Sequence, residues 1–116
     1  MTFVKYYDQY MSKFYCEIED FERKFEEFIG GGYTLSVNSG TAALHIALIL
    51  AGVKEGDEVI STPLTAEPTN VAIKMVGAKI RWADIDPNTG NICPDSIEKA
   101  INIKTKAIVV VHYAGI

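Results

Sequence analysis

A short polar turn in front of an apolar segment contains the residues best suited to bind an anion. Ser39, Gly40 and Thr41 lie between the extended residues 35–37 and the apolar residues 42–51. We expect the apolar residues to form a helix, whose first N–H groups lack partners inside the helix and face outward at the positive end of its dipole. Glycine lets an anion approach the backbone, and the two hydroxyls add donors. The turn is therefore a candidate phosphate site, and the alternative is that Ser39 only caps the helix.

Other polar side chains give weaker evidence for chemistry. The sequence contains no Gly-x-Gly-x-x-Gly and no P-loop lysine motif, which argues against the usual dinucleotide and ATP sites. A serine hydrolase elbow is also missing, because Val37 occupies the place of its first glycine. His45 and His112 have no ligand partner nearby in the sequence, so we interpret them as structural and expect no metal site. Asp84 and Asp86 resemble a carboxylate pair, but turn formation explains Asp86.

Composition and charge exclude several classes of protein. The chain has 116 residues, of which 48% are hydrophobic, so it is folded rather than disordered. Its formal net charge is -4 and its basic residues are scattered, which argues against nucleic-acid binding. No apolar stretch reaches the roughly 20 residues that span a bilayer, and the first residues show no signal-peptide pattern. Cys16 and Cys93 are single, distant thiols, which suit a reducing compartment. We therefore expect a cytoplasmic protein that does not bind membranes.

The N-terminal part is predicted to form one amphipathic helix. Apolar side chains recur at steps of three or four residues, at Phe3, Tyr7, Tyr10, Phe14, Ile18, Phe21, Phe25 and Phe28. The glycines at 30–32 end the helix. We assign residues 1–32 to this helix and its glycine loop. The aromatic face indicates packing against the rest of the chain or another subunit, rather than a binding groove.

Residues 33–116 alternate between strand and helix patterns. Strands are predicted at 35–37, 58–62, 79–85 and 107–111, and helices at 42–51 and after Pro68 and Pro94. The last strand is continuously apolar and β-branched, which is typical of a strand covered on both faces. The pattern predicts an α/β fold with three layers and a mostly parallel sheet. In such a sheet, ligands bind beyond the carboxyl ends of the strands, where the loops 38–41, 62–67 and 84–88 lie.

An ordered series of short motifs resembles a known family. The motifs are SGTAAL at 39–44, GDEVI at 56–60, GA at 77–78, DIDP at 84–87, TGNI at 89–92, IE at 97–98, KTKAI at 104–108 and VHYAG at 111–115. In this order and spacing they resemble the DegT/DnrJ/EryC1/StrS aminotransferases, often called sugar aminotransferases. The resemblance covers the chain from about Phe21 to its end.

The resemblance implies the fold of the type I transferases that depend on pyridoxal 5′-phosphate. Residues 33–116 then correspond to the N-terminal part of the large, cofactor-binding domain. Family members transfer an amino group, usually from glutamate, to a nucleotide-linked keto-sugar in amino-sugar and surface polysaccharide biosynthesis. They work as homodimers with the active site between subunits. Their Gly-Thr pair binds the cofactor phosphate through backbone N–H groups, and this role carries over to Gly40 and Thr41, with Ser39 as neighbour.

The sequence departs from the family pattern in two places. Many members stack an aromatic residue on the pyridine ring, but Ala66 stands at that cofactor-binding position and cannot stack. The lysine that bonds to the cofactor and the aspartate that holds the pyridine nitrogen lie beyond the equivalent of Gly115 and are not in this sequence. We therefore expect no catalytic residue here and no transamination by this chain alone. The alternative function is a non-catalytic α/β module that binds a phosphorylated ligand or a partner.

Overall fold

The chain folds into two compact units. The computed structural model describes residues 3–115, with side chains from Lys13 onward. One unit ends at Val37 and the next begins at Asn38. No helix in the described part of the chain is long and apolar enough to cross a membrane. The division of the chain into an N-terminal helix with its glycine loop and a partial cofactor domain stays a prediction.

The first unit contains the helix α1, Phe3–Ile29, as the apolar periodicity predicted. The helix ends at glycines with positive φ angles, and Gly31 N–H donates to the Glu26 carbonyl at 2.8 Å. In the described part of its apolar face, the Phe21 and Phe25 rings have centroids 6.0 Å apart. Both rings are about half exposed. The side chains expected on this face at Phe3, Tyr7 and Tyr10 lie outside the described residues.

The segment after the glycines corrects one prediction, because residues 35–37 form no strand. Thr34 N–H donates to Glu26 Oε1 at 2.7 Å, and Ser36 N–H and Oγ both donate to Glu22 Oε1. The α1 carboxylates therefore bind the donors that a neighbouring strand would need. Two hydrogen bonds from Ser36 lower the pKa of Glu22 below its ordinary value. The bond from the Ser36 N–H has the larger effect, and the bond from its hydroxyl has the smaller one.

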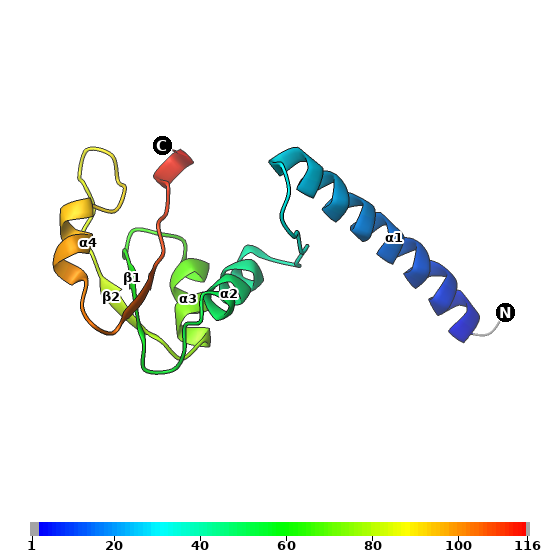
Figure 1. The fold of residues 1–116 in the computed structure, drawn as a ribbon, viewed down its shortest axis with the longest axis horizontal. Helices are drawn as coiled ribbons and strands as arrows, with labels where there is room; N and C mark the ends of the chain where they lie inside the picture. The colour runs from blue at the N-terminus through cyan, green and yellow to red at the C-terminus, as the bar shows by residue number, and fades with distance from the viewer. Residues whose placement is uncertain (1–2, 116) are drawn as a thin grey trace. The chain divides into compact units, whose positions relative to one another are not determined.

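The second unit is built on a three-stranded parallel sheet in the order β2-β1-β3 (Figure 1). The strands are β1, Glu58–Ser61, β2, Lys79–Trp82, and β3, Thr105–Ile108. Val59 of the central strand pairs with Ile80 on one side and with Ala107 on the other. The parallel sheet confirms the predicted fold class, and it brings the loops after the three strands to one edge.

Helices cover both faces of this sheet. Figure 1 shows α2, Gly40–Leu50, and α3, Glu67–Met75, together on one face, and α4, Pro94–Ala100, on the other. Alternate residues of a strand point to opposite faces. Accordingly, Val59 joins the core under α2 and α3, whereas Ile60 joins the core with Ala100 of α4. These three layers carry the loops that were expected to bind a ligand.

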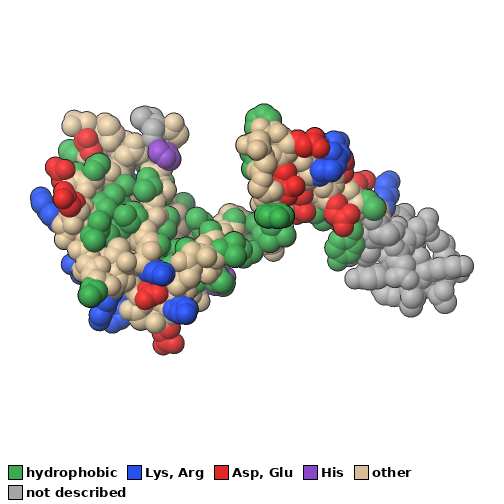
Figure 2. Space-filling view, in the orientation of Figure 1, with side chains coloured by type: hydrophobic (Ala, Val, Ile, Leu, Met, Phe, Trp, Pro, Cys, Tyr) green, Lys and Arg blue, Asp and Glu red, His purple; other side chains and the backbone are tan. Residues whose placement is uncertain are grey.

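The last strand differs from its prediction. β3 lies at the edge of the sheet and packs one face against the described core through Ala107, and Val109, just after the strand, packs there too. Ile108 is 42% exposed and Val110 is 51% exposed. The expectation of a strand covered on both faces is therefore wrong for the described residues. Figure 2 shows hydrophobic side chains at the surface of this unit.

Candidate functional site

The predicted phosphate turn opens helix α2. Ser39 is the N-cap residue, with φ -162° and ψ 155°, and its Oγ accepts a hydrogen bond from Ala42 N–H at 3.2 Å. Its carbonyl accepts from Ala43 N–H at 3.1 Å. The capping alternative is thus correct for the Ser39 side chain, and it accounts for only part of the turn.

Two backbone donors of this turn have no acceptor. Within residues 3–115, no group accepts a hydrogen bond from the N–H of Gly40 or of Thr41. Gly40 and Ser39 are exposed and Thr41 is half-buried. Free N–H groups at a helix N-terminus attract negative charge through their own partial charges and through the helix dipole. The turn therefore offers two free donors to an anion.

Gly40 leaves room for such an anion. Its φ is not positive, so the backbone conformation does not require glycine, and a Cβ built here meets no atom within 4 Å. The described chain therefore gives no conformational or packing reason for glycine at this position. The absent side chain keeps the two amides accessible, which fits a phosphate group approaching from outside.

The second predicted site segment is the loop between β1 and α3. Ala66 is the N-cap residue of α3 and is exposed, and its methyl group provides no side-chain cap. The helices α2 and α3 pack against each other, so the Gly40 turn and the Ala66 loop belong to one packed unit. Asn70 bridges the end of β1 and the start of this loop, which the sequence analysis missed. The only sequence signal was a pair of polar residues, Ser61 and Thr62, at the end of an apolar strand.

The other polar side chains considered from the sequence are Asp86, His45 and His112. The Asp86 side chain accepts from Asn88 N–H at 2.8 Å, and its carbonyl accepts from Gly90 N–H, which confirms the predicted turn. His45 is half-buried on α2, and His112 is exposed after β3. No group of three or more metal-binding side chains forms among the described residues.

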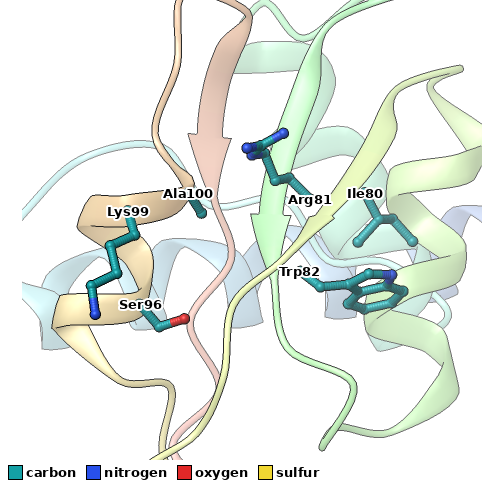
Figure 3. A pocket seen from close by; sticks show the side chains of 6 residues that line it. All are labelled: Ile80, Arg81, Trp82, Ser96, Lys99 and Ala100. Carbon is teal, nitrogen blue, oxygen red and sulfur yellow. The ribbon is translucent and has the colours of Figure 1, made fainter.

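A separate open cavity of about 430 Å³ lies between β2 and α4. Its lining residues are Ile80, Arg81, Trp82, Ser96, Lys99 and Ala100 (Figure 3). None of the predicted cofactor residues lines it. Figure 3 shows the Arg81 and Lys99 side chains extending in different directions, so their charges do not converge on one ligand.

Comparison with known proteins identifies the family. The model of the DegT/DnrJ/EryC1/StrS aminotransferase family matches residues 5–116. The chain belongs to this family. The family resemblance that the sequence motifs indicated is therefore confirmed.

Two relatives of this DegT/DnrJ/EryC1/StrS family chain are much longer than the chain itself. Protein MosB of Rhizobium meliloti is 50% identical over 99 residues, which are 85% of this chain and 20% of MosB. The spore coat polysaccharide biosynthesis protein SpsC of Bacillus subtilis (strain 168) is 46% identical over 99 residues, with 85% of this chain and 25% of SpsC covered. The chain thus spans about a fifth to a quarter of the length of these relatives.

A solved structure that is similar to this chain carries the cofactor. NtdA from Bacillus subtilis, with bound cofactor PMP, superposes with a TM-score of 0.80 and 37% identity over 84% of this chain and 22% of that chain. PMP is the amine form of pyridoxal 5′-phosphate. The family depends on this cofactor, as the resemblance implied, and the chain has part of the α/β fold that holds it.

Proposed function

We propose that this chain forms the phosphate-binding part of a pyridoxal-phosphate-dependent aminotransferase. The full enzyme would transfer an amino group from glutamate to a nucleotide-linked keto-sugar in the cytoplasm, as a homodimer. The observation that supports this proposal is the pair of free N–H groups at Gly40 and Thr41, in a turn where a side chain would meet only open space.

The residues of the chain act on the phosphate end of the cofactor. The Gly40 and Thr41 amides would donate to the phosphate oxygens, and the dipole of α2 would stabilise their negative charge. Ser39 holds the turn by capping α2. Pyridoxal phosphate, when bound, supplies the electron sink for amino transfer. Ala66 would meet the ring with a methyl group only, so the ring contact is small on this side.

The lysines of the second unit favour a non-catalytic contribution from this chain. All of them come shortly before a strand or near its start, on a turn, on a helix end or in the strand itself. They are Lys54, Lys74, Lys79, Lys99, Lys104 and Lys106. These positions lie toward the amino edge of the sheet, whereas Ala66 follows the carboxyl end of β1. The second candidate, a module that binds a phosphorylated ligand without catalysis, is therefore kept for the isolated chain.

A titration with pyridoxine 5′-phosphate tests the proposal. This probe has the ring and the phosphate of the cofactor but no aldehyde, so it does not react with surface lysines. We expect its ³¹P resonance to shift on binding, and inorganic phosphate to compete. Gly40→Ala should weaken binding, because the added methyl group would occupy the open space beside these amides, where we expect the phosphate to lie.

Arg81→Ala is the matched control, because Arg81 lines the cavity between β2 and α4 rather than the turn. We expect it to leave the affinity unchanged. Binding that survives Gly40→Ala and disappears with Arg81→Ala would place the phosphate in the cavity and overturn the proposal.

A further inference from the structure

The end of the central strand contains a buried polar cluster that the phosphate turn does not use. Ser61 and Thr62 are 0% and 1% exposed. Buried polar groups are costly unless they are hydrogen-bonded, so each needs a partner from a neighbouring element. The Ser61 hydroxyl and the Thr62 carbonyl find it in one side chain of α3, that of Asn70, and the Thr62 hydroxyl accepts from Leu64 N–H.

Asn70 forms a bridge between two successive residues of the chain. Ser61 Oγ donates to Asn70 Oδ1 at 2.8 Å, and Asn70 Nδ2 donates to the Thr62 carbonyl at 3.2 Å. The amide therefore uses its acceptor on the last residue of β1 and a donor on the first residue of the loop. This pairing fixes the point at which the chain leaves the sheet.

A second connection holds the middle of the same loop. Thr65 Oγ1 donates to Thr69 Oγ1 at 2.9 Å, and Leu64 N–H donates to Thr62 Oγ1 at 3.3 Å. Ala66 itself has no capping side chain. The side chains of Thr69 and Asn70 thus attach the loop to the first turn of α3. In the sequence, Ala66 lies between the attached loop residues and the start of this helix.

From this arrangement we propose that Asn70 is a positioning residue for the cofactor ring. The inference rests on the proposed function, in which Ala66 stands at the ring-facing position. A large aromatic side chain can reach a ring from an imprecisely placed loop, but a methyl group cannot. Where alanine makes the contact, the position of the loop backbone decides how closely the chain approaches the ring. The Thr69 N–H, which donates to the Ala66 carbonyl at 3.1 Å, fixes one side of Ala66, and Asn70 fixes the other by holding Ser61 and Thr62 at the start of the loop.

The competing interpretation is that Asn70 only satisfies the buried groups at the end of β1. Both interpretations predict a looser loop when Asn70 is truncated. Only the positioning role predicts that the ring of a bound ligand changes its surroundings while the phosphate contacts stay intact. The test therefore needs separate measurements of the loop, the phosphate and the ring.

The experiment uses the whole chain with inorganic phosphate and pyridoxine 5′-phosphate as probes. The variants are Asn70→Ala and Ser61→Ala, with Lys74→Ala at the exposed end of α3 as the matched control. Ser61→Ala removes one hydrogen bond and should speed hydrogen exchange of the Leu64 and Thr65 amides about fivefold, and Asn70→Ala removes two and should speed it further. Inorganic phosphate affinity should remain within about twofold, because the Gly40 turn belongs to α2. The induced circular dichroism of the bound pyridine ring should lose most of its amplitude in Asn70→Ala.

The outcomes separate this inference from the proposed function. If the unmodified chain binds neither probe, the proposed function fails, and the ring-positioning role fails with it. If the chain binds both probes and Asn70→Ala keeps the full ring signal, the proposed function stands and the positioning role is overturned. Unchanged loop exchange in both test variants would also overturn it. If Asn70→Ala does not fold, Ser61→Ala decides, since it removes one of the two bonds that Asn70 makes.

Discussion

The side chain of Asn102 donates to Glu58 Oε2 at 2.7 Å and joins the turn before β3 to the start of β1. The Glu58 side chain is 18% exposed and also lies 3.7 Å from Arg81 Nη1. Glu58→Ala leaves the Asn102 amide without this acceptor, and we expect a loss of about 1–2 kcal/mol in the free energy of unfolding. Urea denaturation measures it. Glu58→Gln keeps an acceptor for Asn102 and should recover most of the loss, and equal losses for both variants would contradict the role of the Asn102 bond.

Gly77 should not tolerate a side chain. Its φ is +77°, and a Cβ built there lies 3.2 Å from Glu55 Cβ and 3.3 Å from Glu55 Cα. Gly77→Ala therefore combines left-handed strain of about 1–2 kcal/mol with a contact against backbone. We expect a clear fall in Tm, measured by circular dichroism. Gly56→Ala is the control, because its φ is +89° and its Cβ meets no atom within 4 Å. If the two variants lose equal stability, the contact with Glu55 contributes nothing.

Ser39 has two separable effects on the phosphate turn. Ser39→Ala removes the cap on Ala42 N–H and should cost about 1 kcal/mol in the free energy of unfolding. Ser39→Asp keeps a capping oxygen and should retain the stability, but its negative charge lies beside the free amides and should weaken phosphate binding. Thermal unfolding and ³¹P titration measure the two effects. Phosphate binding that is as strong in Ser39→Asp as in the unmodified chain would argue against an anion at this turn.

Low pH should weaken the hydrogen bonds that hold Ser36 to Glu22 of α1. The hydrogen bonds from Ser36 hold the pKa of Glu22 below its ordinary value, so the folded unit favours the deprotonated carboxylate. The stabilisation is fully present above the ordinary pKa of about 4.3 and is lost as the pH falls through the lower folded value. The Ser36 amide resonance in NMR should therefore titrate below about pH 4.3. Glu22→Gln should abolish this titration, and a midpoint at or above the ordinary value would contradict the hydrogen bonds.

The exposed edge of β3 should make the isolated chain self-associate. β3 has no further strand beside it among the described residues, and Ile108 at its end and Val110 just beyond are half-exposed, which favours pairing with another chain. We expect light scattering to show species larger than a monomer at micromolar concentration. Replacing both residues by lysine should reduce the association, because charge on an edge strand opposes pairing. A monomer in the unmodified chain would show that the edge is protected.

Much of the second unit could be predicted from local sequence. Gly52 and Gly77 follow helices at the expected places, and the β-branched residues at 58–61 form the central strand. The unpaired N–H groups of Gly40 and Thr41 were predictable because helix termini leave the same groups without partners in every protein. Residues 35–37 were mispredicted because their apolar alternation fits a strand, and only the fold brings Glu22 to the Ser36 N–H and Glu26 to the N–H of the preceding Thr34. The Asn70 bridge was equally hidden, since it joins residues eight and nine positions apart through side chains.

The empty surroundings of Gly40 have a consequence for variant libraries. Alanine is the better helix former, so a library selected for folded protein alone should enrich alanine at this position. A library selected for binding of pyridoxine 5′-phosphate should keep glycine there if the proposed function holds. The difference between the two outcomes would measure directly how strongly ligand binding, rather than folding, constrains this one residue.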